Sequence, residues 1–166
     1  MPRIFLIGMP GAGKTTLGSK VAKKLGMPFL DLDALIEKEY NRSIEDIFSN
    51  EGEEHFRTLE SDQLQKTIRH HDDLVLACGG GTPCFHGNMA LMNDVGVTVY
   101  IDCTIQELDR RLRHEAHRPL LKSGNLEARL EKLLTSRKGF YEQARITVTE
   151  DEGWEGLIES LQSFRS

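Results

Sequence analysis

Residues 3–16 have the sequence RIFLIGMPGAGKTT, an apolar run that breaks into glycines and ends in Lys-Thr. Within it, Gly8, Gly13, Lys14 and Thr15 fit the pattern G-x-x-x-x-G-K-[ST]. Such a loop turns its backbone N–H groups around a phosphate, and the helix that follows adds its own unpaired amides and positive end. The lysine supplies a charge to the outer phosphates and the threonine a hydroxyl to Mg²⁺. The stretch therefore predicts a strand, a nucleoside triphosphate loop and the start of a helix, rather than a glycine turn without a ligand.

Length and composition indicate one globular domain that spans residues 1–166. Apolar residues make up 39% of the chain and charged residues 28%, and the formal net charge is −5. A negative chain without a basic run is not typical of nucleic-acid-binding proteins. No apolar run approaches the roughly 20 residues that a membrane helix needs, and the first strand begins close to Met1. We therefore expect no membrane partner, no signal peptide and a cytoplasmic location.

The three cysteines, Cys78, Cys84 and Cys103, are odd in number and form no C-x-x-C pair. This pattern predicts reduced thiols rather than a disulfide framework or a metal site.

Strand and helix patterns alternate along the whole chain. After the loop, helical periodicity is expected near residues 17–25, 34–40, 44–48, 53–68, 89–95, 104–112, 126–144 and 154–164. Further strands are expected at 28–33, 74–78, 97–102 and 146–149. This order predicts a three-layer α/β domain with a mainly parallel sheet.

Two carboxylates, Asp31 and Asp33, close the second predicted strand. Strand residues two apart point to the same face, so both side chains are expected to face a site near Thr15. The alternative is a solvated strand end at which Asp33 caps the next helix.

Arg57 and Glu60 are three residues apart on a predicted helix. This spacing alone favours an ordinary surface ion pair. By contrast, the three consecutive glycines 79–81 follow an apolar strand, where bare backbone suits close approach to a ligand, although a flexible turn is the alternative.

The most basic stretch, residues 110–122, has no apolar stripe of its own. It is either a solvated loop or a mobile lid that brings cations over a triphosphate. Its residues 114–117 read HEAH, one residue short of the H-E-x-x-H zinc motif, so a metal site is not expected there.

Taken in order, these motifs resemble those of the shikimate kinases, small P-loop kinases of the nucleoside-monophosphate-kinase type. The resemblance covers nearly the whole chain and rests on six segments: Gly8 to Thr15, Asp31-Leu32-Asp33, residues 43–60, Gly79-Gly80-Gly81, Arg118-Pro119-Leu120-Leu121, and Arg137 with Tyr141, Glu142 and Ala144. One departure is Asn41, which stands where the family usually has glycine; asparagine also tolerates left-handed φ.

The resemblance implies a P-loop kinase fold with a five-stranded parallel sheet of order 2-3-1-4-5, a substrate-binding subdomain at residues 33–61 and a lid at 112–124. It implies MgATP-dependent phosphorylation of the shikimate 3-hydroxyl by a monomer. A gluconate-type kinase on the same fold is the alternative, and a nucleotide switch module is a more distant one.

The family's site residues carry over by position. ATP would be bound by Gly11, Ala12, Gly13, Lys14, Thr15, Thr16, Arg111 and Arg118. Shikimate would be bound by Asp33, Arg57, Gly79, Gly80, Gly81 and Arg137. Catalysis would depend on Lys14, Asp33 and Arg118, and Mg²⁺ on Thr15 and, through water, Asp31. For the adenine contact, Arg110 is the alternative to Arg111.

Overall fold

A five-stranded parallel sheet forms the centre of the computed structural model, which describes residues 2–114, 125–149 and 152–164. Its order is β2-β3-β1-β4-β5, as the family resemblance implied, and every neighbouring pair is parallel. The strands are β1 (Arg3–Ile7), β2 (Phe29–Asp31), β3 (Val75–Ala77), β4 (Gly96–Asp102) and β5 (Ile146–Thr149).

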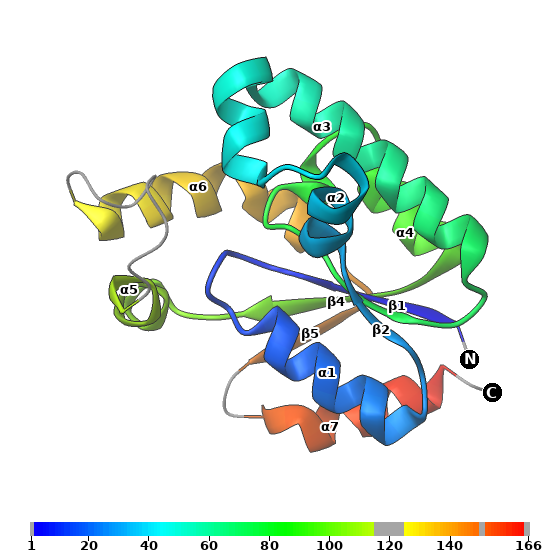
Figure 1. The fold of residues 1–166 in the computed structure, drawn as a ribbon. Helices are drawn as coiled ribbons and strands as arrows, with labels where there is room; N and C mark the ends of the chain where they lie inside the picture. The colour runs from blue at the N-terminus through cyan, green and yellow to red at the C-terminus, as the bar shows by residue number, and fades with distance from the viewer. Residues whose placement is uncertain (1, 115–124, 150–151, 165–166) are drawn as a thin grey trace.

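Helices cover both faces of this sheet, so the predicted three-layer architecture is confirmed (Figure 1). On one face lie α1 (Lys14–Leu25) and α7 (Gly153–Ser163). On the other lie α2 (Leu32–Tyr40), α3 (Ile44–His70), α4 (Asn88–Val95) and α6 (Leu126–Tyr141). The helix α5 (Ile105–Arg113) lies beyond the carboxyl end of β4, and a 3₁₀ turn, η1 (Thr82–Cys84), follows β3. None of the described helices is long and apolar enough to cross a membrane.

The apolar part of β1 is the centre of the hydrophobic core. It pairs with β3 on one side and β4 on the other, and Ile4, Phe5, Leu6 and Ile7 are all fully buried. A strand buried on both faces must be apolar throughout, as this run is. Because β1 is central, the loop that follows it lies in the middle of the sheet's carboxyl edge.

Local signals in the sequence mark several helix ends. Ser43 and Thr104 cap α3 and α5, since their hydroxyls accept hydrogen bonds from the backbone N–H groups of Asp46 and Glu107. Asn41 ends α2 in the left-handed region with a φ of 52°, the conformation for which glycine or asparagine is suited. The helix end expected at residue 40 is confirmed.

The second strand is shorter than expected. It stops at Asp31, and α2 begins at Leu32, so Asp33 lies in the first helical turn and not on a strand face. The cap of α2 is Asp31, whose Oδ1 accepts from the N–H of Ala34 at 3.1 Å, rather than Asp33. The prediction that Asp31 and Asp33 share one face of a strand is therefore wrong. The alternative, that Asp33 caps the next helix, is wrong as well. The physical reason is that a capping carboxylate at Asp31 stabilises the helix start two residues earlier.

Gly18 allows α1 to lie close against the sheet. A Cβ at this position would be 2.6 Å from the Phe29 ring and 2.8 Å from Leu6 Cδ1. Such distances are well inside van der Waals contact, so the glycine sets how near the phosphate-loop helix approaches the strands.

We predict that Gly18→Ala lowers the free energy of unfolding by about 1–3 kcal/mol, because overpacking outweighs the better helix propensity of alanine. Gly139→Ala is the matched control, because Gly139 lies in α6 with nothing within 4 Å of its would-be Cβ. That variant should gain roughly 0.5–1 kcal/mol. Urea unfolding measures both, and two changes of the same sign would contradict the packing argument.

Candidate active site

The loop between β1 and α1 has the backbone of a phosphate-binding loop. Gly8, Gly11 and Gly13 have φ values of 147°, 85° and 91°, which residues other than glycine rarely adopt. A Cβ on Gly8 would also lie 2.8 Å from the carbonyl oxygen of Ile101. The first N–H groups of α1, which no side chain caps, follow directly after Gly13. The loop thus presents backbone donors and a helix N-terminus, the arrangement that stabilises an anion.

Lys14 and Thr15 are held by this loop and its neighbours. Lys14 Nζ donates to the carbonyl oxygens of Gly8 at 2.6 Å and Met9 at 3.0 Å. Thr15 Oγ1 donates to Asp31 Oδ2 at 3.0 Å. A threonine hydroxyl and a carboxylate oxygen are hard oxygen donors of the kind that Mg²⁺ prefers, so this pair fits a magnesium ion between the loop and β2.

Asp33 is half-buried beside the loop. Burial raises the pKa of its carboxyl to about 6, and the negative charges of Asp31 and Glu60 add to this, while Lys14 opposes it. A carboxyl with this pKa is ionised at neutral pH yet basic enough to accept a proton.

The three glycines after β3 bring separate parts of the chain together. A Cβ on Gly79 would lie 3.1 Å from both Asp33 Oδ1 and Glu60 Oε2. On Gly80 it would be 2.7 Å from Arg137 Nη1, and on Gly81 2.5 Å from Arg57 Nη2. Bare backbone is required here because carboxylates and guanidinium groups already occupy the space a side chain would take. The alternative of a merely flexible turn is wrong.

Arg57 and Glu60 form a buried ion pair, not a surface one. Arg57 is 7% exposed and Glu60 1%, and Arg57 Nη1 donates to Glu60 Oε1 at 2.9 Å. The spacing alone had favoured a surface pair; that expectation is wrong because α3 turns this face under the glycine turn. A ring also lies over the guanidinium, since Arg57 Cζ is 4.4 Å from the centre of Phe85.

Arg137 reaches the same glycines from α6. Its Nη1 is buried, and within the described part of the chain it has no hydrogen-bond acceptor. Tyr141, one turn further on, donates its hydroxyl to the carbonyl oxygen of Gly80 at 2.6 Å. A buried donor without an acceptor is costly, and a bound carboxylate would satisfy it.

A cavity of about 850 Å³ borders the phosphate loop and reaches the first two of the three glycines. Residues 10–17 line part of it, and Asp31, Asp33 and Gly80 line another part. Arg110 and Arg111 line it as well. Of these two, Arg111 contacts the phosphate loop, since its Nη1 donates to the carbonyl oxygen of Gly11 at 3.1 Å.

The predicted lid falls mostly outside the described residues. Arg118 and the rest of 115–124 are not described, whereas Leu112 lies within α5 and is 2% exposed. The first residues of the predicted lid are therefore part of the helix.

Cys78, Cys84 and Cys103 are all free thiols, as predicted. Among the described residues, no group of three or more His, Cys, Asp or Glu side chains is placed to hold a metal ion.

Known proteins are similar to this chain in sequence and in fold. The family model for shikimate kinase matches residues 10–163. The chain belongs to the shikimate kinase family. Curated shikimate kinases from Azobacteroides pseudotrichonymphae genomovar. CFP2 and Parabacteroides distasonis are 47% and 44% identical to it. The alignments cover 88% of both chains in the first case, and 89% of this chain and 87% of the relative in the second.

Solved shikimate kinases agree with the whole architecture. The structure from Bacteroides thetaiotaomicron matches with a TM-score of 0.89 and 38% identity, covering 99% of this chain and 98% of that one. The structure from Acinetobacter baumannii in complex with shikimate matches with a TM-score of 0.88 and 35% identity over 99% and 93% of the two chains. A gluconokinase from Sinorhizobium meliloti shares the fold at 15% identity and a TM-score of 0.59.

Two side chains that contact the site of this shikimate kinase family member were not predicted from the sequence. Thr82 Oγ1 donates to Glu60 Oε2 at 2.8 Å, and Phe85 covers Arg57. Both follow the triple glycine, and that nearness is the signal from which they could have been found.

We predict that Asp33→Asn stabilises the fold above pH 6. Because the pKa of Asp33 is raised from 3.8 to about 6, the unfolded chain loses this proton first as pH rises, and the wild-type protein loses stability between those values. The variant should therefore match the wild type below pH 4 and exceed it by about 2 kcal/mol at pH 8.

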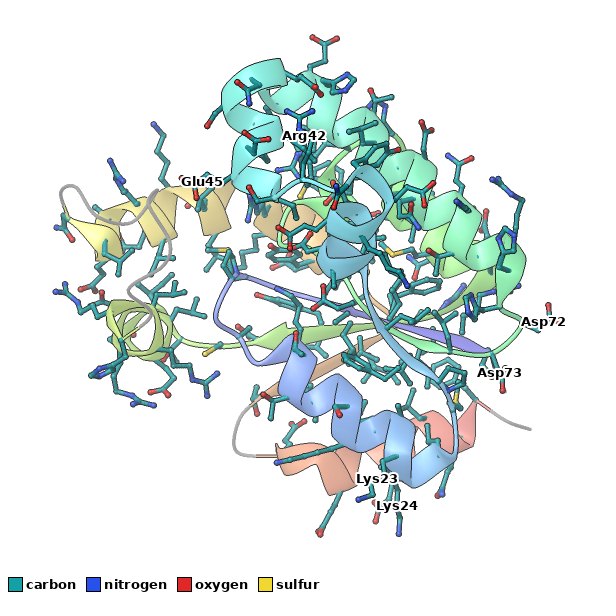
Figure 2. The ribbon with its side chains drawn as sticks, in the orientation of Figure 1. Lys23, Lys24, Arg42, Glu45, Asp72 and Asp73 are labelled. Carbon is teal, nitrogen blue, oxygen red and sulfur yellow. The ribbon has the colours of Figure 1, made fainter. Side chains whose placement is uncertain are left out.

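Urea unfolding at the two pH values measures this difference. Asp73→Asn is the control, because Asp73 lies exposed in the connection between α3 and β3 (Figure 2). A gain that does not depend on pH would contradict the assignment of a raised pKa.

Proposed function

We propose that this protein transfers the γ-phosphoryl group of ATP to the 3-hydroxyl of shikimate, as an enzyme of aromatic amino acid biosynthesis through chorismate. The observation that carries the proposal is the pair of guanidinium groups, Arg57 and Arg137, that close on the triple glycine beside a phosphate loop. Its named relatives are shikimate kinases, and one solved relative holds shikimate.

The carboxylate of shikimate would be bound between the two arginines. Arg57 is fixed by Glu60, and the buried Nη1 of Arg137 is the donor without an acceptor among the described residues. Two planar guanidinium groups suit one planar carboxylate, and the backbone of Gly79, Gly80 and Gly81 would lie against the ring.

Asp33 would orient the 3-hydroxyl and accept its hydrogen bond. Its raised pKa makes it a better proton acceptor than an ordinary carboxylate, so it suits the step in which the hydroxyl oxygen attacks phosphorus and releases its proton. The transfer otherwise depends on alignment and on neutralising the phosphate oxygens.

The triphosphate would be bound by the backbone of Gly11, Ala12 and Gly13 and by Lys14, Thr15 and Thr16 at the start of α1. Arg111, which contacts Gly11, would stack on the adenine. Thr15 would bind Mg²⁺ directly and Asp31 through water; the ion, when bound, neutralises phosphate charge. Arg118 lies outside the described residues, and its role of binding the phosphoryl group that is transferred stays a prediction.

Three further parts of the proposal concern organisation. Residues 33–61 would act as the substrate-binding subdomain, and a lid within 112–124 would exclude water. The protein would act as a monomer in the cytoplasm.

The direct test is ATP consumption by the purified protein with shikimate as the only acceptor. We expect turnover that requires Mg²⁺ and is nearly abolished in Lys14→Met, while gluconate supports none. Turnover with gluconate and not with shikimate would favour the gluconate-type alternative and contradict the proposal.

Arg137→Ala should lower kcat/KM for shikimate by roughly 10- to 150-fold, because a charge-assisted hydrogen bond contributes about 1.5–3 kcal/mol. The KM for ATP should change little. Lys138→Ala, the adjacent cation on α6 with a 62% exposed side chain, is the matched control and should be near wild type. If Arg137→Ala lowered kcat/KM for the carboxamide of shikimate as much as for shikimate, the arginine would not act on the carboxylate.

A further inference from the structure

A ring of buried hydrogen bonds connects Arg57 with the turn that follows the triple glycine. Glu60 Oε1 accepts from Arg57 Nη1 at 2.9 Å, and Glu60 Oε2 accepts from Thr82 Oγ1 at 2.8 Å. Of the described residues, no other donates a hydrogen bond to this carboxylate. Glu60 is 1% exposed and Thr82 is fully buried, so both hydrogen bonds are shielded from bulk solvent.

The ring closes through α4. Asn88 Nδ2 donates to the carbonyl oxygen of Thr82 at 2.9 Å, and Asn88 Oδ1 accepts from Ser61 Oγ at 3.0 Å. Ser61 follows Glu60 on α3, so α3, η1 and α4 are joined by one set of buried polar contacts. Buried networks in which each member has its partner hold side chains in one arrangement.

The position of Glu60 matters for two groups of the proposed site. It holds the guanidinium of Arg57, and it lies beside Asp33, since a Cβ on Gly79 would be 3.1 Å from an oxygen of each carboxylate. If the Thr82 hydroxyl were removed, Glu60 Oε2 would be a buried anionic oxygen without its donor. Glu60 would then rotate or take water, and Arg57 would lose its fixed orientation.

We propose that Thr82 is a positioning residue for carboxylate recognition, acting through Glu60 on Arg57 without touching the substrate. This inference rests on the proposed function. Its signature is a larger loss with acceptors that carry the carboxylate than with acceptors that lack it, because Glu60 holds the arginine by a hydrogen bond and only lies beside Asp33.

The test compares shikimate with its carboxamide in Thr82→Val, Thr82→Ala and Thr82→Ser. Valine keeps the shape of threonine, and alanine removes the hydroxyl with a different packing change, so either one that folds carries the test. Both should raise the KM for shikimate roughly 10-fold, while the KM for ATP changes less than about 2-fold and the kcat/KM for the carboxamide falls by a clearly smaller factor than that for shikimate. Serine restores the hydroxyl and should restore the wild-type KM.

Thr67→Val is the matched control. Like Thr82, Thr67 is a buried threonine, 4% exposed. It lies in α3, and its hydroxyl donates to the carbonyl oxygen of Gln63 within that helix. It should leave the selectivity for the carboxylate unchanged.

Three results would overturn the inference: equal losses with shikimate and the carboxamide, an unchanged KM for shikimate, or a serine variant as impaired as valine. Wild-type protein that does not phosphorylate shikimate would instead contradict the proposed function itself, and this is measured before any variant.

Discussion

The buried carboxylate of Glu60 is the constraint to which the other groups of the site are fitted. An ionised carboxyl that is 1% exposed is unfavourable unless charged and polar partners surround it. Arg57 supplies the charge and Thr82 the second hydrogen bond. The same negative charge disfavours ionisation of Asp33. One buried anion therefore links the fixed arginine of the carboxylate site to the basic strength of the carboxyl beside the phosphate loop.

The fold supports this arrangement because its parallel strands end at one edge. β1 leads into the phosphate loop, β2 into Asp31 and Asp33, and β3 into the triple glycine. Parallel strands of an open sheet deliver their loops to the same crevice. The central position of β1 then places the phosphate loop in the middle of this edge, next to a cavity that Asp33, Arg110 and Arg111 also line.

Much of this could be predicted from residue patterns, because apolar strands and capping residues act locally. The apolar run of β1, the caps Ser43 and Thr104 and the left-handed end at Asn41 are such features. The strand order was implied only by resemblance, since periodicity does not encode which strands pair. The start of α2 was misplaced because an aspartate at the end of an extended run is equally compatible with another strand residue and with a helix cap.

The burial of Arg57 and Glu60 lay beyond local pattern. Residues three apart on a helix can form an ion pair whether that face of the helix is exposed to solvent or buried. Here the face is buried by the glycine turn, which lies some 20 residues further along the chain. Thr82 was missed for the same reason, since its partner Glu60 is separated from it by the C-terminal part of α3 and the whole of β3.

The crowding around Gly79, Gly80 and Gly81 has a consequence for chemical inhibition. A side chain at any of these positions would meet a carboxylate or a guanidinium group within 3.1 Å. An inhibitor that hydrogen-bonds the peptide groups of this turn would therefore contact a surface that point mutation cannot easily reshape. Substitution at any of these three positions would also disturb the charged groups that form the site.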